Sequence, residues 1–333
     1  MNKRSKTLKI FTAVILIGAI VYLLGPKPNH PEYSPQLPNV PALSQLEDYV
    51  KKIESQHKIK PGNEAEIVWA DSSQKQQSDY AVVYLHGYTA SKAEGNPTYF
   101  YLAKLLHANL YLARLADHGV DTVSAMKYST PDRLWESAKQ AFEIGKRLGK
   151  KVIIIGTSTG GTLALKLAAT YPDVNSLILI SPNIEINDKL AFMLNNPWGL
   201  QIARMVIGSK ERVVKNKTRD EKKYWYSSYR LESTVQLQEL LETSMNKTTF
   251  EKVTQPVLLL YYYKNEKEQD HVVRVSAELR MFDQLGTPVP LKTKVAIPNG
   301  GSHVLGSYMT SKDIPSVERA IGSFVKNVLK LTA

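Results

Sequence analysis

The pentapeptide Gly-Thr-Ser-Thr-Gly at residues 156–160 contains the residue best placed to act as a nucleophile, Ser158. Four β-branched residues at 152–155 precede it and predict a strand buried on both faces. The leucine- and alanine-rich run at 163–169 predicts a helix. A sharp strand-to-helix turn exposes such a serine at a helix N-terminus, where the dipole and free N–H groups favour an anion. The pattern therefore predicts a nucleophilic serine; an ordinary glycine-rich turn is the alternative.

A serine hydroxyl needs a base to remove its proton, and the usual base is a histidine that a carboxylate orients. His303 follows the last predicted strand, at 291–297, in a glycine-rich loop. Asp270 follows the strand predicted at 256–261, although Glu266 and Glu268 in the same loop are rival acids. The order nucleophile, acid, base is typical of a serine hydrolase built on a parallel sheet.

Acyl transfer also needs two N–H donors for the oxyanion. The amide of Thr159, directly after the serine, is one candidate. The second is the amide of Tyr88, which lies in the loop after the strand predicted at 79–85. We expect His86 in this loop to be a structural histidine, and His118 to be a loop residue at the rim of the pocket.

The elements that must position these residues alternate between strand and helix. This alternation predicts an α/β fold with a mostly parallel central sheet, helices on both faces and right-handed crossovers. Residues 183–253 interrupt the pattern, and we interpret them as a helical cap insert within a domain at 42–333. The cap contains a basic run: Lys210, Arg212, Lys215, Lys217, Arg219, Lys222 and Lys223.

Four motifs together resemble the α/β-hydrolase superfamily, in particular carboxylesterase and monoacylglycerol-lipase-like serine hydrolases, over roughly residues 79–331. They lie at residues 85–88, 156–160, 270–273 and 302–305. The resemblance implies an α/β-hydrolase fold that cleaves carboxylic esters through an acyl-enzyme, with no metal and no organic cofactor. In that scheme Ser158 attacks, His303 acts as base and then acid, and Tyr88 and Thr159 hold the oxyanion.

The resemblance also bears on the acid. Two valines directly after Asp270 match the family's junction between acid and helix, which favours Asp270 over Glu266 and Glu268. The preceding loop departs from the family because it is longer and lacks glycine. We expect a small-molecule or lipid ester as substrate and no nucleic acid partner. A peptidase, thioesterase or acyltransferase would use the same site, and a non-catalytic binding protein of this fold is a further alternative.

The N-terminal residues have a different composition. Residues 1–25 join a basic flank to the apolar run 10–24, which predicts a signal anchor with the catalytic domain on the exported side. Secretion after signal cleavage is the alternative. The prolines in 26–41 predict an extended linker. With a net charge of +12, the basic cap suggests a membrane partner. The absence of cysteine excludes disulfides and thiolate metal sites.

Overall fold

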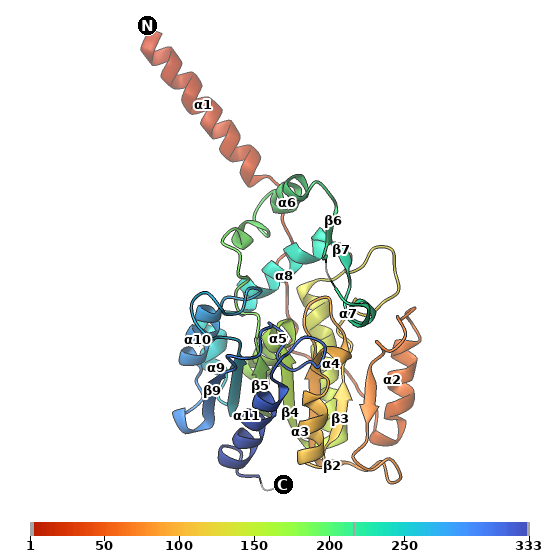
Figure 1. Cartoon of the computed structure of the whole chain (residues 1–333). Coiled ribbons are helices and arrows are strands. Elements are labelled where there is room, and N and C mark those ends of the chain that lie inside the picture. The colour runs from red at the N-terminus through yellow and green to blue at the C-terminus, as the bar shows by residue number, and fades with distance from the viewer. Residues whose placement is uncertain (1–2, 216, 332–333) are drawn as a thin grey trace.

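A seven-stranded sheet forms the centre of the computed structural model, which describes residues 3–215 and 217–331 (Figure 1). Its order is β1-β3-β2-β4-β5-β8-β9. β1 pairs antiparallel with β3, and the other neighbouring pairs are parallel. The strands are β1 (Glu66–Val68), β2 (Ser78–Leu85), β3 (Asn109–Leu112), β4 (Gly149–Thr157), β5 (Val174–Ile180), β8 (Val257–Tyr261) and β9 (Lys292–Ala296). The predicted α/β-hydrolase architecture, a mostly parallel sheet between helices, is confirmed.

Helices cover both faces of this sheet because the central strands are apolar on both sides. Along β4, Val152 and Ile154 join one core cluster, whereas Ile153 and Ile155 join the other. The first cluster also contains residues from α2 (Leu46–Glu54), α4 (Pro131–Leu148), α5 (Thr159–Thr170) and α10 (Val275–Gln284). The second contains residues from α3 (Thr98–Leu105) and α11 (Ile314–Asn327). The sheet therefore has fixed strand ends on which loops can position side chains.

The turn from β4 into α5 depends on two glycines. A Cβ on Gly160 would lie 1.9 Å from the carbonyl oxygen of Leu85, at the end of β2. A Cβ on Gly156 would lie 2.5 Å from the carbonyl oxygen of Gly160. No side chain fits at either position, so glycine is what allows α5 to start so close to β2 and β4.

Residues 183–253 are the stretch that we interpret as a cap: its part up to residue 244 lies over one end of the sheet, whereas residues 247–252 pack beside the sheet against α5 and α10 (Figure 1). Residues 183–253 form α6 (Gly199–Ile207), α7 (Arg219–Tyr224), α8 (Leu231–Ser244) and α9 (Lys247–Lys252). They also contain a short antiparallel pair, β6 (Glu211–Val213) and β7 (Ser228–Arg230), which the sequence analysis did not predict. Four short 3-10 helices complete the described elements: η1 (Leu43–Gln45), η2 (Lys92–Gly95), η3 (Ala191–Met193) and η4 (Val289–Leu291).

The prediction of a membrane anchor is wrong. The N-terminal helix α1 (Lys3–Leu23) points away from the rest of the chain (Figure 1). Across residues 3–215 and 217–331, no helix is both long enough and apolar enough to span a membrane. The basic residues at 3–9 belong to the helix itself, and the apolar run that remains, 10–23, measures about 21 Å at 1.5 Å per residue. A bilayer core is about 30 Å thick. The predicted exported, membrane-bound location depended on this anchor and is wrong with it, whereas the membrane partner suggested for the basic cap stays a prediction.

The proline-rich residues 26–41 lie along the domain rather than extending away from it. The indole N–H of Trp135 donates to the carbonyl oxygen of Ser34 at 2.8 Å, and the ammonium of Lys139 donates to the same oxygen at 2.9 Å. The hydroxyl of Tyr171 donates to the carbonyl oxygen of Pro35 at 2.9 Å. Side chains of α4 and the end of α5 thus bind a backbone that has few hydrogen bonds of its own.

One buried carboxyl group in this core has no hydrogen bond. Glu278 lies on the face of α10 that also buries Val275, Met281 and Phe282, and it is 0% exposed. Neither of its carboxyl oxygens has a partner among the described residues. Burial, together with the nearby charge of Asp270, raises the pKa of Glu278 well above its usual range. Burial therefore favours the neutral form of this side chain, and a buried polar group without a hydrogen bond destabilises the fold.

Replacing Glu278 by methionine should stabilise the protein at pH 7 by about 1–3 kcal/mol, because the unpaired polar group is removed. The pKa of Glu278 is higher in the folded than in the unfolded chain, so wild-type stability falls as pH rises above the unfolded value of about 4.3. The gain in the free energy of unfolding should therefore be larger at pH 7.5 than at pH 4.5, and urea denaturation at the two pH values measures it. Glu251→Met, at an exposed position of α9, is the matched control; an equal gain there would contradict the interpretation.

Candidate active site

Ser158 occupies the sharp turn between β4 and α5. Its backbone has φ 52° and ψ −118°, a strained conformation for a residue other than glycine, and it is the N-cap of α5. The amide of Ser158 donates to the carbonyl oxygen of Ile180 at 3.0 Å, and the amide of Asn183 donates to the carbonyl oxygen of Ser158 at 3.0 Å. These bonds from the end of β5 hold the turn, so the strain persists and Ser158 points away from the sheet at the start of a helix.

His303 and Asp270 form a buried pair between the loops after β9 and β8. The distance from Nδ1 of His303 to Oδ2 of Asp270 is 2.6 Å. The other carboxylate oxygen of Asp270 accepts the amide N–H groups of Val272 at 2.7 Å and Val273 at 3.1 Å. Every oxygen of this carboxylate is therefore paired, and its orientation fixes the imidazole ring with Nδ1 protonated.

Each member of this buried pair shifts the pKa of the other. Burial raises the pKa of Asp270, but His303 and the two amide donors outweigh it and leave the pKa below its ordinary value. For His303, burial lowers the pKa, and the charges of Asp270 and Glu94 outweigh it and raise the pKa. The site thus favours the protonated imidazole, the form that a general base reaches after it takes a proton.

The outward nitrogen of His303, Nε2, is buried and has no hydrogen-bond partner among residues 3–215 and 217–331. Ser158 and His303 line the same cavity, but no hydrogen bond joins them in this structure. Such bonds are often long before substrate binds. The unpaired Nε2 is available to accept a proton in the cavity.

The rival acids lie elsewhere. Glu268 is exposed and forms an ion pair with Lys264 at 2.7 Å. Glu266 is also exposed, and one of its carboxylate oxygens accepts the hydroxyl of Tyr263 at 2.9 Å. Of the three acids weighed from the sequence, Asp270 is the one that the structure brings to His303.

The loop after β2, which contains Tyr88, lies against the turn of Ser158: a Cβ on Gly87 would lie 3.1 Å from the Cβ of Ser158. The amides of Tyr88 and Thr159 donate no hydrogen bond to other described residues, so both remain available. His86 is fully buried and braces the loop: Nε2 accepts the amide N–H of Leu115 at 3.1 Å. Burial lowers the pKa of His86 well below its usual range, so it is a neutral histidine.

His118 does not lie at the pocket rim, where the sequence analysis expected it. It is buried, and its ring centroid is 4.9 Å from that of His86. Burial lowers the pKa of His118 to about 4, so this histidine is also neutral at pH 7. The rings of His86 and His118 pack edge to face in the protein interior and so support the loop after β2.

Glu94 is a site residue that the sequence analysis missed. It is 2% exposed, borders the cavity and accepts the amide N–H of Gly87 at 2.5 Å and the hydroxyl of Tyr84 at 3.3 Å. Burial raises the pKa of Glu94 to about 7, although Gly87 and the charge of His303 act in the opposite direction. The sequence offered one signal for Glu94: it lies in the same loop as His86, after the strand predicted at 79–85.

The cavity that contains Ser158 and His303 has a volume of about 690 Å³. Most of its lining comes from apolar side chains of the cap, including Leu190, Met193, Ile202 and Val206. A cavity of this size and composition can enclose an apolar chain next to the polar groups. Among the described residues there is no group of three or more metal-ligating side chains.

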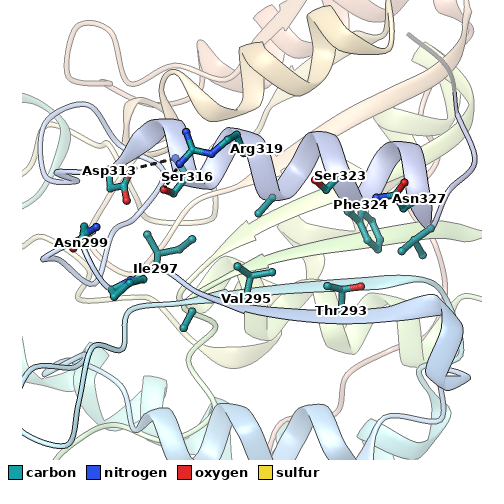
Figure 2. A pocket seen from close by; sticks show the side chains of 14 residues that line it. Thr293, Val295, Ile297, Asn299, Asp313, Ser316, Arg319, Ser323, Phe324 and Asn327 are labelled. Carbon is teal, nitrogen blue, oxygen red and sulfur yellow. Dashed lines mark hydrogen bonds between the residues drawn. The ribbon is translucent and has the colours of Figure 1, made fainter.

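A second cavity, of about 550 Å³, lies between β9 and α11, and Figure 2 shows its lining. Apolar side chains such as Val295 and Phe324 line it together with polar ones, and Arg319 donates to the hydroxyl of Ser316 at 2.7 Å (Figure 2). It contains none of the predicted site residues, so the chemistry belongs to the first cavity.

Comparisons with known proteins agree with the fold. The model of the alpha/beta hydrolase family matches residues 82–311. No curated protein matches the chain in sequence.

Similar solved structures include one from the metagenome-derived lipolytic enzymes LipS and LipT, with 18% identity, 80% of this chain and 99% of that chain covered, and a TM-score of 0.64. The monoacylglycerol lipase of Paleococcus ferrophilus has 16% identity, coverages of 78% and 97%, and a TM-score of 0.55. Est1E from Butyrivibrio proteoclasticus with bound ferulic acid has 16% identity, coverages of 83% and 99%, and a TM-score of 0.53. At these identities the likeness is one of fold.

Proposed function

The chain belongs to the alpha/beta hydrolase family, and on that premise we propose that it is a serine hydrolase that cleaves carboxylic esters through an acyl-enzyme intermediate. The observation that carries the proposal is the 2.6 Å contact between His303 Nδ1 and Asp270 Oδ2, which leaves Nε2 unpaired at the cavity of Ser158. Hydrolysis of acyl groups needs this combination of nucleophile, oriented base and acid.

In the first half of the reaction, Ser158 Oγ attacks the ester carbonyl carbon while His303 Nε2 takes the hydroxyl proton. Asp270 stabilises the imidazolium that results. The amides of Tyr88 and Thr159 donate to the oxyanion of the tetrahedral intermediate. When the intermediate collapses, the bond to the alcohol oxygen breaks, and His303 returns the proton to the leaving alcohol.

The second half repeats these steps with water. His303 Nε2 removes a proton from water, which attacks the acyl carbon, and the bond to Ser158 Oγ breaks with return of the proton. The products are a carboxylic acid and the free enzyme. An ester is favoured over an amide because the largely apolar cavity suits an acyl chain, and the similar structures named above include lipolytic enzymes and a monoacylglycerol lipase.

Replacing Ser158 by alanine should lower kcat/KM for p-nitrophenyl esters by roughly 10³-fold or more, since the nucleophile and base act as a unit. The same substitution should abolish covalent labelling by a fluorophosphonate probe. Thr162→Ala is a buried control on the same helix that should keep the label. A wild-type protein that neither labels nor hydrolyses esters, thioesters or aminoacyl substrates would identify a binding protein instead.

The choice of acid is tested by two substitutions. Asp270→Asn should lower kcat by roughly 10²- to 10⁴-fold, because an amide cannot stabilise the imidazolium and favours the wrong tautomer. Glu268→Gln should leave kcat within about twofold, since this exposed side chain pairs with Lys264. Steady-state kinetics with one p-nitrophenyl ester measure both. The reverse pattern would mean that Asp270 is not the acid.

Glu94→Gln should move the acid limb of the kcat/KM profile to lower pH. The negative charge of Glu94 raises the pKa of His303, and the neutral imidazole is the active base. Removing that charge lowers the pKa of His303, so the base becomes neutral earlier as pH rises, by roughly half a unit to one unit. The measurement is kcat/KM between pH 4.5 and 9. Glu266→Gln, an exposed charge, should not move the limb, and a shift to higher pH for Glu94→Gln would refute this electrostatic role.

A further inference from the structure

Two cationic side chains of the cap border the cavity without an acidic partner. Arg212 lies on β6, and its guanidinium has neither a hydrogen bond nor an ion pair with any residue in the described part of the chain. Lys217 follows β6; its ammonium donates to the carbonyl oxygen of Tyr226 at 3.1 Å and lies 5.6 Å from the ring centroid of Trp225. No ion pair involves Lys217 within residues 3–215 and 217–331. The cavity therefore has two cations that form no ion pair within the described residues, although the acidic residues Glu94 and Asp188 also line it.

Burial disfavours the charged form of Lys217. It is half-buried, and burial lowers its pKa to about 8, while Glu221 and Glu94 act in the opposite direction and Lys60 adds to the lowering. Each of the two nearby carboxylates accepts a backbone amide N–H, that of Thr218 for Glu221 and that of Gly87 for Glu94, and neither forms an ion pair with Lys217 within the described residues. A bound anion would supply the partner that the protein does not.

Both cations belong to elements that contact the loops of Tyr88 and His303, and the side chain of Arg212 is exposed. Trp225, beneath Lys217, packs in one cluster with Ala90 and Val304, and Val304 directly follows His303. Arg212 pairs across the small sheet with Tyr229. The ring of Tyr229 lies 5.3 Å from that of Tyr88, whose amide is an oxyanion donor in the proposed mechanism. The cations thus belong to the side of the cap that covers the Tyr88 and His303 loops.

Much of the remaining lining is apolar and comes from residues 186–207, with Leu190, Met193, Leu194, Ile202 and Val206, although Asn187 and Asp188 of the same stretch also border the cavity. An apolar chain can be buried among these side chains, whereas a charged group cannot. An ester whose carbonyl lies at Ser158 would therefore place its hydrocarbon part towards α6 and its polar part towards Lys217 and Arg212.

We propose that the preferred substrate is an acyl ester of an alcohol that carries an anionic group, a carboxylate or a phosphate, which Lys217 and Arg212 bind. This inference rests on the proposed esterase function and names its substrate class. Guanidinium and ammonium groups form charge-assisted hydrogen bonds with both anions, and Arg212 can donate two to one group. The apolar part of the cavity, lined by residues 186–207, binds the acyl chain.

The test compares three esters with one short acyl chain: the 1-acylglycerol, its 3-phosphate and the corresponding O-acyl glycerate, a carboxylate. The measured quantity is the ratio of kcat/KM for each anionic ester to that for the neutral one, in the full chain. The wild-type ratio should be roughly ten or more for at least one anion, and it should fall roughly tenfold in Lys217→Gln and in Arg212→Gln, because each loses a charge-assisted hydrogen bond. High salt should lower it as well.

Lys215→Gln is the matched control, because it removes an exposed lysine of the same loop that does not line the cavity. It should keep the wild-type ratio. A preference shared by both anions, or confined to one of them, supports the proposal. A wild-type ratio of one or less, or a ratio unchanged in both cavity variants, overturns it. These results are distinct from failure of the esterase function, which would appear as no hydrolysis of the neutral ester and no labelling at Ser158.

Discussion

The close approach of α5 to the end of β2 is the contact on which the site depends. Gly160 has no side chain, so its Cα can lie against the carbonyl oxygen of Leu85, where any Cβ would come within 1.9 Å. As a result Ser158, two residues before Gly160, and Tyr88, three residues after Leu85, meet at the same edge of the sheet. The proposed nucleophile, after one strand, and the proposed oxyanion donor, after its neighbour, are thus brought to one edge of the sheet with the help of a single backbone contact.

Three buried carboxyl groups show how the number of donors sets charge in this interior. Asp270 accepts two amides and faces His303, and its pKa is lowered. Glu94 accepts one amide and one hydroxyl, and burial raises its pKa to about 7. Glu278 accepts no hydrogen bond among the described residues, and its pKa is raised well above the usual range. Of the three, Asp270 is the one held as a full negative charge at neutral pH, which is the property that an orienting acid needs.

Local patterns in the sequence predicted the parts of this structure that local physics determines. The β-branched residues before Gly156 and the small residues after it indicated the strand, the turn and the helix. Glu94 was not predicted as a site residue because its burial results from tertiary packing around a loop that is polar in sequence. The anchor prediction failed because the short apolar run at 10–24 was judged long enough once Thr7, Leu8 and Gly25 extend it, whereas no helix among residues 3–215 and 217–331 is long and apolar enough to span a membrane. β6 and β7 were missed because each has three residues, and their pairing across residues 211–230 leaves no periodic signal.

The cap and the oxyanion loop share one residue, and this links substrate recognition to the chemistry. The hydroxyl of Tyr88 lies 2.6 Å from that of Ser233 on α8, and its ring packs edge to face on Tyr229 of β7. The amide of the same residue points to the reaction in the proposed mechanism. Ser233 is buried, and its hydroxyl also donates to the carbonyl oxygen of Arg230, so the contact is fixed within the cap. A displacement of β7 or α8 therefore acts directly on Tyr88, and a ligand that positions the cap also positions an oxyanion donor.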